Sequence, residues 1–250
     1  MTSIIANSTG ALSFGKKLEK EIEGEVLFDN FSRGQYATDA SIYQMIPTGV
    51  VIPKNSSDIE KVINLGRKDG ISLLARGGGT SQSGQTVNNS VVLDNSKFLN
   101  KIIEIDVKNR SCVVEPGIVL DELNRILKPH GLWFPVDIST SSRATIGGMA
   151  ANNSCGGRSI RYGTMRDNVI SIEGFMSDGS YCHFGTMENP NTSDLSKALK
   201  LIGERDALEI EYRFPKLIRR GGGHNIDALI PKGEPHNLSH LLVGSEGTLV

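Results

Sequence analysis

The stretch Arg76-Gly-Gly-Gly-Thr-Ser-Gln-Ser-Gly-Gln-Thr86 decides the fold of this chain. It stands between two runs of strand-forming residues, Ile71–Ala75 and Ser90–Leu93. Glycines let the backbone approach an anion closely and adopt positive φ angles, so that successive N–H groups point into one concavity. Hydroxyl donors follow at Thr80, Ser81 and Ser83. The stretch predicts a phosphate-binding loop, and the alternative is a flexible Gly/Ser turn.

This glycine loop differs from the two commonest phosphate-binding motifs. It lacks the Gly-Lys-Ser/Thr ending of the P-loop. It also lacks the G-x-G-x-x-G pattern that opens a helix after the first strand of a dinucleotide-binding fold. If the loop holds a pyrophosphate, we therefore expect it to do so on a different fold.

The composition is that of a soluble globular protein with a sizeable core, since 38% of the 250 residues are hydrophobic and 22% are charged. With 27 Lys and Arg residues against 28 Asp and Glu residues the net charge is -1, which argues against a nucleic-acid partner. The apolar runs are far shorter than the roughly 20 residues that cross a bilayer, and the N-terminus lacks the pattern of a secretory signal. We expect a cytoplasmic protein, or one held peripherally at a membrane through a partner.

The three cysteines indicate a reducing compartment. Cys112, Cys155 and Cys182 are odd in number and form no C-x-x-C pair. Reduced thiols are the simplest account, and the pattern encodes neither a zinc site nor an iron–sulfur cluster.

The periodicity of apolar residues predicts an α+β fold in two lobes. Strands at 49–53, 71–75 and 90–93 surround the glycine loop, which indicates a small lobe with a parallel-type β/α layer. A capping box at Ser57–Glu60 opens a helix between the first two strands, with Ile59, Val62 and Ile63 on one face, and Gly70 ends it. Residues 1–45 are expected to form an arm with peripheral helices, one of them at 16–23.

The second lobe is predicted to be larger and antiparallel. Hairpins at 101–115 and 169–184 alternate apolar and polar residues about polar turns. Helices follow at 120–127 and after a cap at Ser193, the latter with Leu195, Leu199 and Ile202 on its apolar face. We expect the lobes to span residues 46–98 and 99–250.

A second glycine-rich region begins at Thr145. From there to Gly157 small residues alternate with amide side chains, which suits close backbone contact with a flat ring rich in heteroatoms, such as a flavin. The alternative is a helix packed closely against a sheet through its Gly and Ala residues. Both can hold, because close packing would also deliver backbone N–H groups to a ring.

Five segments in this order resemble the FAD-binding domain shared by vanillyl-alcohol oxidase, p-cresol methylhydroxylase (PCMH) and the FAD-linked D-2-hydroxyacid dehydrogenases. The segments are Pro47–Pro53, Arg76–Gly84, Ile146–Gly148 with Asn152–Gly157, Arg161–Asn168 and Gly244–Leu249. The resemblance covers most of residues 45–250. It implies a two-lobed PCMH-type fold that binds FAD.

Three further segments resemble the branch that acts on D-lactate or D-2-hydroxyglutarate, namely Tyr36–Tyr43, Asn153–Gly157 and Gly223–Leu229. Members of that branch often carry a C-terminal iron–sulfur region, so such a cluster is expected only from a missing region or a partner. The sequence stops at Val250, where these proteins continue into a substrate-binding cap. We therefore expect a fragment or a separate flavin-binding half.

The resemblance implies hydride transfer from the substrate α-carbon to flavin N5. The family's catalytic base and metal-binding histidines usually lie in the cap, so the sequence names no catalytic residue. The pyrophosphate is assigned to Arg76, Gly77, Gly78, Gly79, Thr80, Ser81 and Gly84. The ribityl chain and ring are assigned to Pro135, Asp137, Thr145, Gly148, Asn152 and Ser154, and the adenine side to Glu246 and Gly247.

Several relatives attach the flavin covalently through a histidine directly after the loop glycines. Here that position is Thr80, so we predict non-covalent FAD. The run Arg220-Gly-Gly-Gly-His224 resembles the covalent loop by letter only, because it lacks the strand-loop-strand context.

Candidates for binding a substrate carboxylate are Arg219, Arg220 and His224, and the alternative is a solvated basic turn. His236 and His240 have the i, i+4 spacing of helical metal ligands. Pro235 precedes them and no acidic residue is suitably spaced, so we predict no metal site.

The leading functional hypothesis is an FAD-linked dehydrogenase that oxidises a small D-2-hydroxy acid. Electrons would pass to a quinone, a cytochrome or an iron–sulfur protein. One alternative is a same-fold enzyme with another substrate, such as an alditol oxidase or a cell-wall-precursor reductase. The other is a non-catalytic FAD-binding subunit that needs a cap-bearing or iron–sulfur partner.

Overall fold

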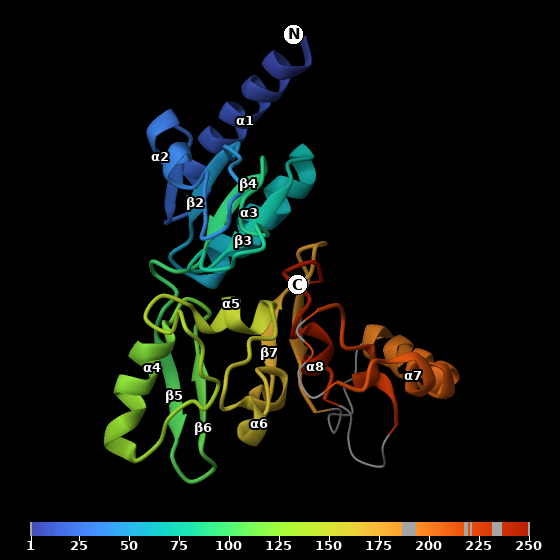
Figure 1. Ribbon diagram of the computed structural model, residues 1–250. Helices are drawn as coiled ribbons and strands as arrows, with labels where there is room; N and C mark the ends of the chain where they lie inside the picture. Colours follow the sequence, from blue (N-terminus) through green and yellow to red (C-terminus); the bar gives the residue numbers. More distant parts are fainter. Residues whose placement is uncertain (1, 187–193, 218–219, 221, 232–236, 250) are drawn as a thin grey trace. The chain divides into compact units, whose positions relative to one another are not determined.

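The computed structural model describes residues 2–186, 194–217, 220, 222–231 and 237–249, and these residues divide into two compact units (Figure 1). Residues up to 134, together with 140–148 and 177–179, form the first unit. The second unit contains 135–139, 149–176 and the chain from 180 onward. Parallel and antiparallel pairing both occur, as the α+β prediction requires. The expected lobe boundary near residue 98 stays a prediction.

A four-stranded sheet organises the first unit, in the order β1 (Glu25–Leu27), β2 (Gly49–Ile52), β4 (Val91–Asp94) and β3 (Leu73–Arg76). Strands β2, β4 and β3 run parallel, which confirms the parallel layer. Strand β1 pairs antiparallel with β2 and was not expected. All four residues of β2 and of β4 are buried, as is typical of strands covered on both faces.

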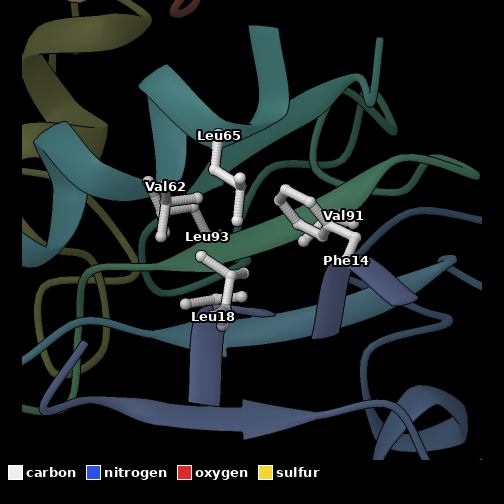
Figure 2. Packing of buried hydrophobic residues seen from close by; sticks show 7 residues of the cluster. Phe14, Leu18, Val62, Leu65, Val91 and Leu93 are labelled. Atoms are coloured by element: carbon white, nitrogen blue, oxygen red, sulfur yellow. The ribbon is translucent and has the colours of Figure 1, made fainter. Parts of the chain in front are cut away.

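Helices α1 (Thr2–Glu21) and α3 (Ser56–Asp69) cover one face of this sheet. Figure 2 shows Phe14 and Leu18 of α1 meeting Val62 and Leu65 of α3 over Val91 and Leu93. The prediction of a helix at 16–23 was too short, since α1 begins at Thr2 and supplies part of the core. On the other face Val50, Ile52 and Val92 form a second cluster.

The predicted capping box at Ser57 was wrong. The N-cap of α3 is Asn55, whose side chain accepts a hydrogen bond from the Asp58 N–H. Asp58 is buried, and its carboxylate accepts hydrogen bonds from the N–H groups of Glu23 and Lys54. These bonds attach two chain segments to the start of the helix. Gly70 ends the helix in the left-handed conformation, as predicted.

The first unit also contains the predicted hairpin of β5 (Ile102–Asp106) and β6 (Ser111–Val114). Helix α2 (Asn30–Gln35) is capped by Asp29. Helix α4 (Leu120–Leu127) has the predicted bounds and buries its three leucines. The 3-10 turn η1 (Lys128–His130) follows, and helix α5 (Ile146–Ala151) passes from the first unit into the second.

The second unit holds the predicted hairpin of β7 (Ile172–Phe175) and β8 (Tyr181–Phe184). Short helical elements are α6 (Ser159–Tyr162), η2 (Arg166–Asn168), η3 (Ile226–Leu229) and α8 (Ser239–Leu242). Phe184, Leu229, Leu238, Leu241 and Leu242 form its core. No helix among the described residues is long and apolar enough to cross a membrane.

The long helix α7 (Asp194–Arg213) buries a different face from the predicted one. Leu199 packs on the core, but Leu195 and Ile202 are 40% and 39% exposed. The buried residues are Gly203 and Ile210, because Gly203 lies directly against the backbone of Leu229. The predicted cap Ser193 lies outside the described residues.

Candidate cofactor-binding site

The glycine loop joins two neighbouring parallel strands, β3 and β4, without an intervening helix. Among the described residues, the backbone N–H groups from Gly77 to Gln82 have no hydrogen-bond acceptor. The Thr80 hydroxyl also lacks a partner there. A row of donors without acceptors is the arrangement that suits an anion. The loop therefore fits the pyrophosphate of FAD.

The loop glycines are required by packing within the protein. A β-carbon on Gly77 would overlap the Thr145 hydroxyl, and one on Gly78 would overlap the carbonyl oxygen of Arg143. Gly79 and Gly84 have φ angles of 62° and 80°, which favour glycine. From the sequence, two reasons were expected for these glycines, close approach of an anion and positive φ angles, and Gly79 and Gly84 have such angles. In the structure the missing β-carbons make room for neighbouring protein groups.

Arg76 donates hydrogen bonds to backbone carbonyls of two chain segments. Its guanidinium Nη1 donates to the carbonyls of Tyr36 and Thr86 at 3.3 and 3.2 Å, and Nη2 donates to the carbonyl of Thr38 at 2.8 Å. It also lies 5.3 Å from the centre of the Tyr36 ring. These contacts engage Arg76 in holding backbone, so its role toward the pyrophosphate stays a prediction that the geometry does not favour.

The start of α5 lies beside the glycine loop. Thr145 is buried, and its hydroxyl accepts a hydrogen bond from the Gly148 N–H at 3.3 Å. The N–H of Gly147 donates to the Pro116 carbonyl at 2.8 Å. The first unit therefore brings Thr145 and Gly148, two predicted cofactor residues, next to Gly77 and Gly78.

Asp137 belongs to the second unit, where it holds the turn after α5. Its Oδ1 accepts from the Arg158 N–H at 2.9 Å, and its carbonyl lies against Gly156. Ser154 donates its hydroxyl to the Asn152 side chain at 2.6 Å. Pro135 lies in the same short segment as Asp137 and is half-buried.

The segment Gly244–Leu249 joins the end of α5. The N–H groups of Gly244 and Glu246 donate to the carbonyls of Ala150 and Ala151, each at 2.8 Å. Glu246 and Gly247 are exposed and have φ angles of 55° and 70°. The second unit thus brings the residues predicted for the adenine side next to those predicted for the ring.

Arg220 lines a cavity of about 330 Å³ within the second unit. Its guanidinium carbon Cζ lies 4.0 Å from the centre of the Phe214 ring. Its Nη2 donates to the carbonyls of Gly223 and His224 and to the side-chain oxygen of Asn225. The Nε and Nη1 groups have no partner among the described residues. Burial lowers the pKa of Arg220, Asp227 opposes this shift and Arg166 adds to it.

The other predicted cationic residues contribute less to this cavity. His224 is exposed, and its Nε2 lies 3.3 Å from the Thr248 hydroxyl. Arg219 and His236 lie outside the described residues. His240 is in α8, where burial and Arg166 lower its pKa. Within the described part of the chain, no three His, Cys, Asp or Glu side chains gather to hold a metal.

Sequence reasoning missed the residues that organise this cavity. Arg166 Nη1 donates to both carboxylate oxygens of Asp227, at 2.9 and 3.0 Å. Asn153, with a φ of 50°, accepts from the Arg166 N–H and donates to the Arg220 carbonyl, each at 3.0 Å. Asn tolerates the left-handed conformation better than most residues, so the pair Asn152-Asn153 was the available signal.

Comparison with protein families matches residues 47–185 to a family described as "FAD binding domain". That segment is more than half of the chain and contains both the glycine loop and α5. The chain belongs to this FAD-binding family. FAD is therefore its cofactor, as the resemblance implied.

Relatives of this FAD-binding protein include two bacterial enzymes named D-2-hydroxyglutarate dehydrogenase. The enzyme of Haemophilus influenzae is 33% identical over 92% of this chain and 24% of its own length. That of Pseudomonas putida is 34% identical over 99% of this chain and 26% of its own length. The mitochondrial D-lactate dehydrogenase [cytochrome] of Kluyveromyces lactis is 36% identical over 66% of this chain and 29% of its own length. The chain thus spans about a quarter of the D-2-hydroxyglutarate dehydrogenases that it matches.

Solved structures support the fold assignment. Alkyldihydroxyacetonephosphate synthase superposes with a TM-score of 0.64 at 20% identity, covering 74% of this chain and 36% of the synthase. The 6-hydroxy-D-nicotine oxidase of Arthrobacter nicotinovorans gives 0.60 at 22% identity, covering 68% of this chain and 37% of the oxidase. These likenesses confirm the predicted PCMH-type fold and carry no conclusion about substrate.

Proposed function

We propose that this chain is the FAD-binding part of a dehydrogenase that oxidises a D-2-hydroxy acid such as D-lactate or D-2-hydroxyglutarate. The observation that carries the proposal is the row of N–H donors from Gly77 to Gln82, which lacks acceptors in the described protein. Relatives named D-2-hydroxyglutarate dehydrogenase, matched along nearly the whole chain, support the choice of substrate class.

The role of this chain is to bind and orient the cofactor. When bound, FAD would accept a hydride from the substrate α-carbon at flavin N5. The loop N–H groups and the Thr80 hydroxyl would hold the pyrophosphate, and Thr80 forms no covalent bond to the flavin. We keep Asp137, Thr145, Gly148, Asn152 and Ser154, with Pro135, as candidates for the ribityl chain and ring. Glu246 and Gly247 remain candidates for the adenine side.

The cavity lined by Arg220 is the candidate site for the substrate carboxylate. The guanidinium is held through Nη2 and stacks on a ring, so its Nε and Nη1 groups, which lie on different edges, can each donate one charge-assisted hydrogen bond to a carboxylate. Arg220→Lys removes these two planar donors but keeps the charge. We expect the substitution to raise the substrate concentration needed for half-maximal flavin reduction by about tenfold.

A second candidate function is an FAD-binding part that turns over only with a substrate-binding cap. It is favoured because the chain matches only about a quarter of the length of the D-2-hydroxyglutarate dehydrogenases. In this case the base comes from another segment or subunit. For either function the electron acceptor would be a quinone, a cytochrome or an iron–sulfur protein, and the enzyme would be cytoplasmic or peripheral at a membrane.

The test uses the purified chain and added FAD. We expect a flavin absorbance band near about 450 nm. Anaerobic addition of D-2-hydroxyglutarate or D-lactate should bleach the band, while the L-enantiomers, an alditol and NADPH should leave it. No flavin band after refolding with FAD would contradict the cofactor site. Bound flavin that no substrate bleaches would favour the cap-dependent function, and bleaching by the alditol or NADPH alone would overturn the substrate class.

A further inference from the structure

A loop of the N-terminal region, residues 36–46, is fastened onto the glycine loop within the first unit. The 36–46 loop folds back on itself, because the Met45 N–H donates to the Ala37 carbonyl at 2.9 Å. Its first residue is anchored to the end of β4, where the Tyr36 hydroxyl donates to Asp94 Oδ2 at 2.6 Å. Burial and this hydrogen bond raise the pKa of Tyr36, so the phenol stays protonated as the donor.

Two contacts tie the 36–46 loop to the start of the glycine loop. Arg76 donates to the carbonyls of Tyr36 and Thr38 on one side and to that of Thr86 on the other. The Ala40 N–H donates to the Gly79 carbonyl at 3.0 Å. This bond orients the peptide between Gly79 and Thr80, whose N–H is one of the donors without an acceptor in the described protein.

Asp39 ties the far end of the glycine loop. Its Oδ2 accepts the Thr86 hydroxyl at 2.7 Å, and its Oδ1 accepts the Ser41 N–H at 2.8 Å. Burial opposes the charged form of Asp39, but these hydrogen bonds and nearby Arg76 outweigh it and hold the pKa below its usual range. Tyr43 completes the contact, since its ring fills the space beside Gly84.

We propose that Asp39 is a positioning residue for the pyrophosphate, acting through Thr86 to hold the glycine loop in the shape that presents its N–H donors. The inference rests on the proposed pyrophosphate role of that loop. A loop of this length loses conformational entropy when its donors converge on an anion. Ties at both ends, made before the cofactor arrives, reduce that loss and raise the affinity for FAD.

The test compares three variants of the full chain. Thr86→Val removes only the hydroxyl donor, and Asp39→Asn weakens the acceptor. The matched control is Thr48→Val, which deletes a hydroxyl that donates to the Asn89 carbonyl in the same unit. Dissociation constants for FAD and for ADP, which contains the pyrophosphate, are measured by fluorescence titration and calorimetry. The urea midpoint of each apoprotein is measured alongside.

We expect Thr86→Val and Asp39→Asn each to weaken the binding of FAD and of ADP about tenfold, with urea midpoints close to the parent value. The double variant should bind FAD and ADP as tightly as the single variant with the lower affinity, because both substitutions act through the hydrogen bond between Thr86 and Asp39. Unchanged affinities in Thr86→Val, an equal loss in Thr48→Val, or a loss matched by a falling urea midpoint would each overturn the inference.

Failure of the pyrophosphate assignment itself is seen separately with Thr80→Glu, which introduces a negative charge in the loop. If Thr80→Glu loses FAD while Thr86→Val does not, only the role of Asp39 is wrong. If neither loses FAD, the glycine loop is not the pyrophosphate site.

Discussion

The carbonyl oxygen of Asp137 occupies the position that a β-carbon on Gly156 would take. The carboxylate of the same aspartate accepts a hydrogen bond from the Arg158 N–H. Gly156 and Arg158 therefore both contact Asp137, one at its backbone carbonyl and the other at its side chain. The neighbouring Gly157 is different, because a β-carbon there would meet only Asp137 Oδ2, at 3.7 Å. Two adjacent glycines therefore have opposite tolerances for a side chain.

We predict that Gly156→Ala destabilises the protein by about 2 kcal/mol or more, since the added carbon meets backbone that cannot rotate away. Gly157→Ala is the matched control and should leave the free energy of unfolding unchanged within error. Urea denaturation followed by circular dichroism measures both. Equal stability of the two variants would show that the turn relaxes around Gly156.

A charge placed in the glycine loop should expel the cofactor. Thr80→Glu puts a carboxylate beside the proposed pyrophosphate, and we expect a loss of FAD affinity of about tenfold or more from the like-charge repulsion. Thr80→Gln has nearly the same shape without the charge and should retain FAD. Flavin fluorescence titrations in low salt compare the two, and equal affinities would place the pyrophosphate elsewhere.

The ion pair of Arg166 and Asp227 should stabilise the second unit. The Asp227 side chain is only 13% exposed, so Asp227→Ala leaves a guanidinium without its partner in a sheltered place. We expect a loss of about 2 kcal/mol. The control is Asp206→Ala, which removes the partner of Arg205 at the surface of α7 and should have no measurable effect. An equal response of the two variants in urea denaturation would contradict this view of the pair.

His240 should make stability depend on pH. Burial and Arg166 lower its pKa in the folded state, so the unfolded chain binds the proton more readily. The neutral side chain therefore contributes stability that is present above about pH 6.5 and is lost as the pH falls through the folded pKa. His240→Gln should flatten the fall in urea midpoint between about pH 7 and 5, and a variant that kept the parent's slope would contradict this role of His240.

The flavin should be bound without a covalent link. Thr80 stands at the position where, by the sequence resemblance, flavoproteins that attach their flavin covalently carry a histidine. Its side chain offers no nucleophilic nitrogen. Acid precipitation of the FAD complex should leave the yellow colour in the supernatant and the protein pellet colourless. Flavin fluorescence that remained with the pellet in a denaturing gel would show a covalent bond at another residue.

Local signals in the sequence determined most of the elements around the glycine loop. The apolar runs of β2 and β4, the leucines of α4 and the turn of the β7–β8 hairpin were predicted correctly, because periodicity and turn residues act over a few neighbouring positions. The same signals failed for α7, whose buried face depends on the distant Leu229 backbone. They also misplaced the cap of α3, where Asn55 precedes two serines that could serve equally.

The sequence by itself determined the family and the FAD cofactor, because the motifs and their order along the chain can be recognised without knowing any tertiary contact. Only the tertiary structure decided what the motif residues do. Arg76 holds the 36–46 loop, and Gly78 makes room for the carbonyl of Arg143. These partners lie about 40 and 65 positions away along the chain, and local sequence carries no information about which distant group will fill a given space.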